Sequence, residues 1–175
     1  MRVNNFLAMM EMPYKIKIHQ LESQETLGFV IHMALVNKYT NIELAPTDVG
    51  VGYSQVLPLI TQAALSRRSL VCVEQPELHL HPAMQARIAD VFIDAAMGGS
   101  NVQFLIETHS ESLMLRFLRR IREGLMDPES IQVLYIDQDS EGASHIHELP
   151  ISPSGEFLAE WPHGFFDDRL EELGW

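Results

Sequence analysis

The stretch LVCVEQPELHLHP, residues 70–82, constrains the fold of this chain more than any other segment. Its four leading residues are apolar and rich in valine, which predicts a strand buried on both faces of a sheet. Glu74 follows at the end of that strand, and Pro76 ends its hydrogen-bond ladder. Pro82 suits the first turn of a following helix. Because ligands of open α/β sheets bind beyond the carboxyl ends of the strands, Glu74 is well placed to hold a divalent ion beside a nucleotide.

The pattern continues as alternating strands and helices from residue 70 to residue 136. After the central strand we expect a helix at 82–97, a strand at 102–106, a helix capped by Ser110 and a strand at 131–136. Such alternation is typical of parallel βαβ units and predicts an α/β fold. The strand 102–106 runs into Glu107 and His109, so these side chains and Glu74 are expected to converge on one edge of the sheet.

A small antiparallel β element is predicted ahead of this core. Residues 4–12 suggest a short helix, and strands are expected at 14–18, 27–36 and 42–44, with a turn between the last two. The boundaries that follow are 1–46 for this element, 47–137 for the core, and 138–175 for an edge strand with an acidic and aromatic extension. The extension is expected to dock through four aromatic residues, namely Phe157, Trp161, Phe165 and Phe166.

Gly50 and Gly52 predict a flexible turn, with a helix from about Ser54 in which Pro58 occupies the first turns. The helix has an apolar stripe at Val56, Ile60, Ala63 and Ala64. A glycine turn that opens a helix presents free backbone N–H groups, which suit an anion such as phosphate. Turn glycines before helices are common, so this feature alone is a weak indication.

Composition narrows the classes of protein that fit. The chain has 175 residues, 46% of them hydrophobic and 21% charged, as in a soluble globular domain. No membrane span and no signal-peptide core are evident, and Cys72 is the only cysteine, so we expect a cytoplasmic protein. The net charge of −12 argues against a broad nucleic-acid surface. An arginine cluster at 116–122 is better explained as a solvated helix face than as a phosphate-contact stripe.

The polar residues near the central strand admit two functional interpretations. They are Glu74, Glu77, His79, His81, Glu107 and His109. One interpretation is a dedicated metal site, in which the HLH spacing points both rings to one side of an extended segment, although zinc sites usually show more diagnostic spacing. The other is a nucleotide site, with a carboxylate on Mg²⁺ and a histidine near the γ-phosphate. A structural alternative remains, in which His79 and His81 only shape a loop.

Three segments, GVGYSQ, VCVEQPELHLHP and ETHSES, in this order and at these distances, together resemble the second half of an ABC-type ATPase domain. The resemblance is greatest to bacterial AAA-type proteins related to the RecF and OLD (overcoming lysogenization defect) ATPases. The segment WPHGFFDD is similar to the C-terminal extension of one such group. Over residues 14–175 the resemblance implies a partial P-loop NTPase fold that uses ATP and Mg²⁺.

By position, residues 50–55 resemble the signature motif, which in this family touches the γ-phosphate of ATP bound by the opposite protomer. Glu74 matches the Walker B acidic residue that holds Mg²⁺, residues 79–82 match a loop at the dimer interface, and His109 matches the switch histidine. The resemblance therefore implies catalytic roles for Glu74, Gln75, Glu77 and His109, and nucleotide contacts for Gly50, Gly52, Tyr53, Ser54, Gln55, His79 and His81.

The chain departs from the family pattern in three ways. Gln75 occupies the general-base position, where an amide cannot accept a proton at neutral pH; Glu77 is the nearest substitute. The signature lacks its usual Ser-Gly pair. No GxxxxGK[ST] loop is present, since none of the three lysines follows a glycine.

We therefore expect this chain to be the C-terminal part of a larger ATPase, which a Walker A-bearing segment or subunit completes. A homo- or heterodimer is expected, with nucleic acid reached through the complete assembly. A non-catalytic regulatory or scaffold subunit that donates the signature in trans is the alternative, and a metal-dependent hydrolase is less favoured.

Overall fold

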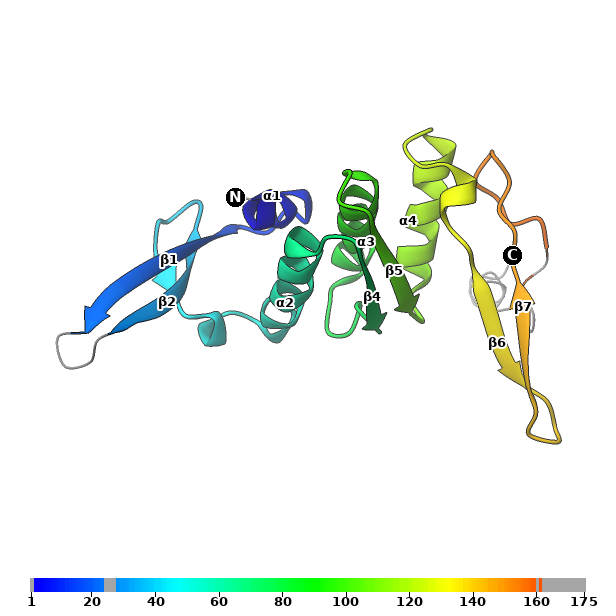
Figure 1. Ribbon diagram of the computed structural model, residues 1–175, viewed down its shortest axis with the longest axis horizontal. Helices are drawn as coiled ribbons and strands as arrows, with labels where there is room; N and C mark the ends of the chain where they lie inside the picture. The colour runs from blue at the N-terminus through cyan, green and yellow to red at the C-terminus, as the bar shows by residue number, and fades with distance from the viewer. Residues whose placement is uncertain (1, 24–27, 160, 162–175) are drawn as a thin grey trace, which may run out of the picture. The chain divides into compact units, whose positions relative to one another are not determined.

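The computed structural model describes residues 2–23, 28–159 and 161, and it divides into two compact units, Met1–Leu113 and Met114–Trp175. The helices and strands, most of them labelled in Figure 1, are α1 (Arg2–Met9), β1 (Tyr14–Ser23), β2 (Gly28–Asn37), β3 (Glu43–Leu44), the 3-10 turn η1 (Pro46–Asp48), α2 (Val51–Leu65), β4 (Ser69–Glu74), α3 (Pro82–Met97), β5 (Val102–Glu107), α4 (Glu111–Arg122), the 3-10 turn η2 (Pro128–Ser130), β6 (Leu134–Gln138) and β7 (Ser144–Glu148). No helix in this part of the chain is long and apolar enough to cross a membrane.

The predicted strand–helix–strand unit around residue 82 is confirmed. β4 and β5 pair in parallel, with Ser69 opposite Val102 and Glu74 opposite Glu107. α3 begins at Pro82 and is capped at its other end by Gly98. Its expected stripe is buried, namely Ile88, Val91, Phe92 and Ala95. The ring of Phe92 lies 5.0 Å from that of Phe104 on β5, so α3 packs against one face of the β4–β5 pair (Figure 1).

The expectation that the central strand is buried on both faces is wrong for this chain. Val71 is buried, but Leu70 is 59% exposed and Cys72 is also exposed. Leu105, opposite Cys72 on β5, is 60% exposed. Because side chains alternate along a strand, α3 covers one set of positions, and no described segment buries the other. An apolar sheet face is therefore left open in the first unit.

The antiparallel β element is present at the N-terminus of the first unit. β1, β2 and β3 form one sheet in that order, and β1 runs to Ser23 instead of ending near residue 18. The base of the β1–β2 pair is buried at Ile16, Ala34 and Leu35. Asn4 on α1 fixes this base, since its Oδ1 accepts the N–H of Ile16 at 2.8 Å.

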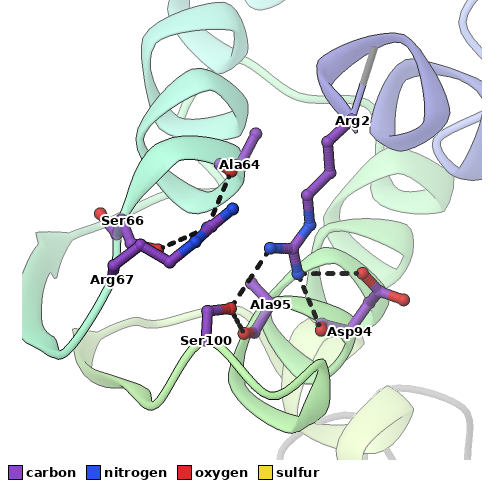
Figure 2. A network of polar contacts seen from close by, with 7 residues as sticks. All are labelled: Arg2, Ala64, Ser66, Arg67, Asp94, Ala95 and Ser100. Carbon is purple, nitrogen blue, oxygen red and sulfur yellow. Dashed lines mark hydrogen bonds and ion pairs between the residues drawn. The ribbon is translucent and has the colours of Figure 1, made fainter.

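Three helices provide the core of the first unit, since α1 contacts both α2 and α3. Their most deeply buried side chains include Phe6, Leu7, Met10, Val56, Ile60, Ile88 and Phe92. Arg2 joins α1 to the end of α3, donating to the Ser100 hydroxyl at 3.2 Å and to the Asp94 carbonyl at 3.3 Å (Figure 2). Because Asp94 lies in the last turn of α3, the guanidinium stabilises the negative end of that helix.

The second unit contains a β-hairpin. β6 pairs antiparallel with β7, which confirms the expected edge strand near 144–149, and the strand expected at 131–136 begins at Leu134. Trp161 stacks edge-on against Phe157 and Tyr135. Docking by Phe157 and Trp161 is thus observed, whereas Phe165 and Phe166 lie outside the described residues.

The arginine cluster of α4 has local partners. Arg119 and Arg120 both pair with Glu123, and these guanidinium groups hold the pKa of the Glu123 carboxyl below its usual value. Arg122 donates to the carbonyls of Ser154 and Gly155. These contacts favour the interpretation of α4 as a solvated helix face with ordinary ion pairs.

Candidate functional site

The ends of β4 and β5 meet at one edge of the sheet, as expected. Glu74 lies directly opposite Glu107, and the N–H of Gln75 donates to the Glu107 carbonyl at 2.8 Å. Both glutamate side chains are exposed. The segment 107–110 therefore leaves the sheet beside the loop that begins at Gln75, and His109 and Glu74 lie at adjacent strand ends.

The loop between β4 and α3 is a tight turn. Gln75 and His79 have left-handed backbone angles, with φ of 44° and 59°, and the N–H of Leu80 donates to the Glu77 carbonyl at 3.0 Å. The segment is thus not extended. The expectation that an extended HLH segment points the rings of His79 and His81 to one side is therefore wrong. His81 instead caps α3, since its Nδ1 accepts the N–H of Ala83 at 3.3 Å. This contact supports a loop-shaping role for His81.

Glu77 is the buried acidic residue of the site. Its side chain is 8% exposed, and Oε1 accepts the backbone N–H of His109 at 2.8 Å. Its second oxygen, Oε2, is buried and has no hydrogen-bond partner within the part of the chain that the structure describes. A carboxylate contact across 32 positions in sequence therefore joins the loop after β4 to the segment that carries the exposed His109.

Gln85 on α3 is a site residue that the sequence did not suggest. Its Nε2 donates to the Leu80 carbonyl at 3.0 Å, and its Oε1 accepts from the Ser110 hydroxyl at 2.8 Å. Ser110 in turn accepts the N–H of Leu113 at 3.1 Å, which confirms it as the cap of α4. A single glutamine on a helix face matches no motif, so only the tertiary contacts reveal this residue.

The signature-like segment forms the start of α2. The helix begins at Val51, not near Ser54, because Gly50 already serves as its N-cap. Gly52 is therefore helical, not part of a turn, and Pro58 lies in the helix interior. The Ser54 hydroxyl donates to the Val51 carbonyl at 2.8 Å within its own helix.

Tyr53 and Gln55, the other two candidate residues of the segment 50–55, differ in their surroundings. The Tyr53 ring packs edge-on against Tyr14 at 5.3 Å, which ties the start of α2 to β1. The Gln55 side chain is exposed. Within the segment 50–55, the exposed residues are Gly50, Val51 and Gln55, so the start of α2 is partly accessible to solvent.

Gly52 brings this segment against the loop after β4. A Cβ added at Gly52 would lie 2.6 Å from the His79 carbonyl oxygen and 3.3 Å from the Leu80 side chain. Only glycine permits this approach, because the atom in the way belongs to the backbone. The three motif segments are therefore gathered within one unit: 50–55 contacts 79–80, and Glu77 contacts His109.

We expect the Gly52→Ala variant to be destabilised by about 2 kcal/mol, since an added methyl group must displace the His79 carbonyl. Thermal unfolding followed by circular dichroism measures this effect. Gly50→Ala is the matched control, because a Cβ there meets only the Tyr53 ring at 3.8 Å and the residue has negative φ. Equal stability of the two variants would contradict the close approach.

The exposed carboxylates at the strand ends offer oxygen atoms, which are the donors that Mg²⁺ prefers. Within the described residues, no three His, Cys, Asp or Glu side chains are grouped closely enough to hold a metal ion. Mg²⁺ is usually bound by one or two carboxylates, with water and phosphate oxygens completing its shell. The exposed Glu74 carboxylate at the strand end is an oxygen donor of this kind.

A parallel strand–helix–strand unit occurs in many α/β proteins that bind nucleotides beyond the carboxyl ends of their strands. Residues 3–114 match the family model described as AAA ATPase domain, and this chain belongs to that family of P-loop ATPases. Residues 126–174 match a second family, described as protein of unknown function (DUF3696). No curated protein matches the chain.

Solved structures of SMC ATPase heads share the fold. One, from work on ATP-driven dimerization and DNA-stimulated activation of SMC ATPases, has a TM-score of 0.62 and 13% identity, and the match covers 99% of this chain and 89% of that chain. An Smc head bound to the C-terminal winged-helix domain of ScpA has a TM-score of 0.63 and 13% identity. The match covers 85% of this chain and 41% of that chain.

The Smc head of Pyrococcus furiosus, bound to the C-terminal domain of ScpA, has a TM-score of 0.61 and 10% identity. The match covers 85% of this chain and 34% of that chain. The chain thus spans less than half the length of these last two structures. At such low identity the likeness concerns the fold alone, which is that of an ATPase head.

Proposed function

We propose that this chain supplies the signature, Walker B and switch-histidine residues of an ABC/RecF-like ATPase, with its core at residues 47–137. The observation that carries the proposal is the position of Glu74 and His109 at adjacent parallel strand ends, where Glu77 in the loop after β4 accepts the His109 N–H. Membership of the AAA ATPase family supports a nucleotide-dependent role. The expected cofactors are ATP and Mg²⁺.

Each residue has a distinct part in this proposal. The Glu74 carboxylate holds Mg²⁺, which when bound neutralises charge on the phosphates. His109 is exposed at the next strand end, where its imidazole can donate a hydrogen bond to a γ-phosphate oxygen. The backbone N–H groups and the positive dipole end at the start of α2 favour contact with an anion, here the phosphate of a nucleotide bound by a partner protomer.

Completion by another segment is part of the proposal. The 175 residues contain no GxxxxGK[ST] loop, so the groups that cradle the β- and γ-phosphates must come from a Walker A-bearing segment or subunit. The exposed apolar face of β4 and β5, with Leu70, Cys72 and Leu105, is suited to covering by that segment. We further propose a dimeric assembly that reaches nucleic acid only as a whole, given the net charge of −12.

A regulatory or scaffold subunit is a second candidate, and Gln75 favours it. Gln75 follows Glu74 where this family has a general base, and its amide cannot take a proton from water. Such a subunit would donate the start of α2 to a partner's nucleotide without hydrolysing ATP at its own Glu74.

Titration with ATP–Mg²⁺ tests the proposal. We expect the chain alone to bind ATP with a Kd of about 1 mM or weaker, because it lacks the phosphate-binding loop. Co-expression with the segment encoded upstream or in a neighbouring reading frame that carries GxxxxGK[ST] is expected to raise ATPase activity at least about tenfold over either part. Isothermal calorimetry and phosphate release measure the two quantities.

Each outcome of this experiment has a defined meaning. Micromolar affinity of the chain alone would contradict the need for a Walker A-bearing segment. A stable complex with that segment that binds ATP without hydrolysing it would favour the scaffold subunit. A segment whose Walker A lysine is replaced by alanine is the matched control, and it should form the same complex without activity.

A further inference from the structure

The geometry points to a clamp formed by Glu77 and Gln85, two positioning residues that hold the segment 107–110, and with it His109, against the loop after β4. The inference rests on the proposed function for its consequence in catalysis, because His109 is the residue proposed to contact the γ-phosphate. Neither Glu77 nor Gln85 needs to touch the nucleotide, since both act through the backbone and side chains of the segment they hold.

The first arm of the clamp is the Glu77 carboxylate. Oε1 accepts the backbone N–H of His109 at 2.8 Å from a side chain that is almost fully buried. This bond fixes the peptide plane that precedes the Cα of His109, and so it sets the point from which the exposed imidazole projects.

The second arm is the Gln85 side chain. Its Nε2 donates to the Leu80 carbonyl, and its Oε1 accepts the hydroxyl proton of the buried Ser110. The same hydroxyl oxygen accepts the N–H of Leu113, so Gln85 orients the cap of α4. His109 is therefore held on both sides: its own N–H binds Glu77, and the next residue binds Gln85.

Only one of the two carboxylate oxygens of Glu77 makes the contact with His109, so a substitution can distinguish a positioning role from a role that needs the carboxylate itself. Oε2 has no hydrogen-bond partner among the described residues, so the observed contact uses only one acceptor oxygen. A glutamine amide oxygen in the same place can accept the His109 N–H and likewise leaves one buried polar group unpartnered. Glu77→Gln should therefore preserve the clamp, whereas Glu77→Ala should release it. In this proposal Glu77 acts by positioning His109, whereas the sequence suggested Glu77 as a substitute general base, and the two variants distinguish these roles.

Amide hydrogen exchange, measured by NMR on the chain itself, tests the clamp without ATP. In Glu77→Ala the His109 amide is expected to exchange at least about tenfold faster, with α3 core amides such as Ile88 and Val91 unchanged. Glu77→Gln should stay within about threefold of the parent chain. Gln85→Ala should accelerate exchange of the His109 and Leu113 amides. Gln62→Ala is the control and should not, because the Gln62 side-chain amide donates to Ser66 one turn along its own helix.

Two outcomes would overturn the clamp. One is an unchanged His109 amide in Glu77→Ala. The other is equal acceleration of His109 and the α3 amides in that variant, which would show that Glu77 only stabilises the fold.

Activity of the completed ATPase then tests the catalytic consequence. Glu77→Ala is expected to lower kcat about tenfold with little change in KM for ATP, and Glu77→Gln should retain most activity. If Glu77→Gln is as inactive as Glu77→Ala, Glu77 acts through carboxylate chemistry, and the positioning role is wrong. If the parent complex hydrolyses no ATP while His109 exchange still depends on Glu77, the clamp stands and the proposed function fails.

Discussion

Replacing Glu74 with glutamine is expected to lower Mg²⁺-dependent ATP turnover of the completed assembly by about 100-fold or more. The substitution keeps the size and hydrogen-bonding reach of the side chain but removes the negative charge, and Mg²⁺ is bound mainly by charged oxygen donors. Because Glu74 is exposed at the end of β4, the variant should fold normally. Phosphate release at varied Mg²⁺ concentration measures the effect.

Glu107→Gln is the matched control for this prediction. Glu107 lies directly opposite Glu74 on β5, its side chain is also exposed, and the substitution is the same. We expect it to lower turnover less than about tenfold, because only a general reduction of charge at the sheet edge is then involved. Unchanged turnover in Glu74→Gln, or equal losses in both variants, would contradict the assignment of Glu74 as the Walker B acid.

The Gly155→Ala substitution is expected to destabilise the second unit by about 3 kcal/mol. Gly155 is buried with φ of +69°, and an added Cβ would lie 2.2 Å from the Leu118 carbonyl oxygen and 3.1 Å from the Arg122 backbone nitrogen. The left-handed conformation costs alanine about 1–2 kcal/mol, and overpacking against the rigid backbone of α4 adds a similar amount. Urea unfolding followed by tryptophan fluorescence measures the loss, since both tryptophans belong to residues 114–175.

Gly124→Ala separates the two contributions. Gly124 has nearly the same φ, +70°, but it is exposed and a Cβ there would have no neighbour within 4 Å. Its variant should lose only the conformational part, about 1 kcal/mol. If Gly155→Ala is no less stable than Gly124→Ala, the close packing of residue 155 against α4 is incorrect.

Much of the fold could be predicted because its signals are local. α3 was expected at 82–97 and occupies Pro82–Met97, since a proline at the first position and a glycine after the last one mark both ends. The start of α2 was predicted less well, at Ser54 instead of Val51. The turn η1 and the N-cap Gly50 allow the helix to begin sooner, and a glycine inside a helix is easily mistaken for part of a turn.

The site could be predicted only in part. The convergence of Glu74 and His109 followed from parallel pairing of β4 and β5, which a strand–helix–strand pattern implies. The contacts of Glu77 and Gln85 could not be foreseen, because each joins residues far apart in sequence through side-chain geometry. The extended geometry expected for His79 and His81 is wrong because Gln75 and His79 have left-handed backbone angles that turn the loop. Residues other than glycine give no sequence signal for such angles.

The sequence by itself determined the order of strands and helices and the carboxylate and histidine at two neighbouring strand ends, because periodicity, caps and chain order encode these features locally. The tertiary structure alone decided that one face of β4 is open, that Gly52 lies against His79, and that Glu77 holds His109. Burial and long-range hydrogen bonds depend on which segments pack together, and that information is distributed over the whole chain.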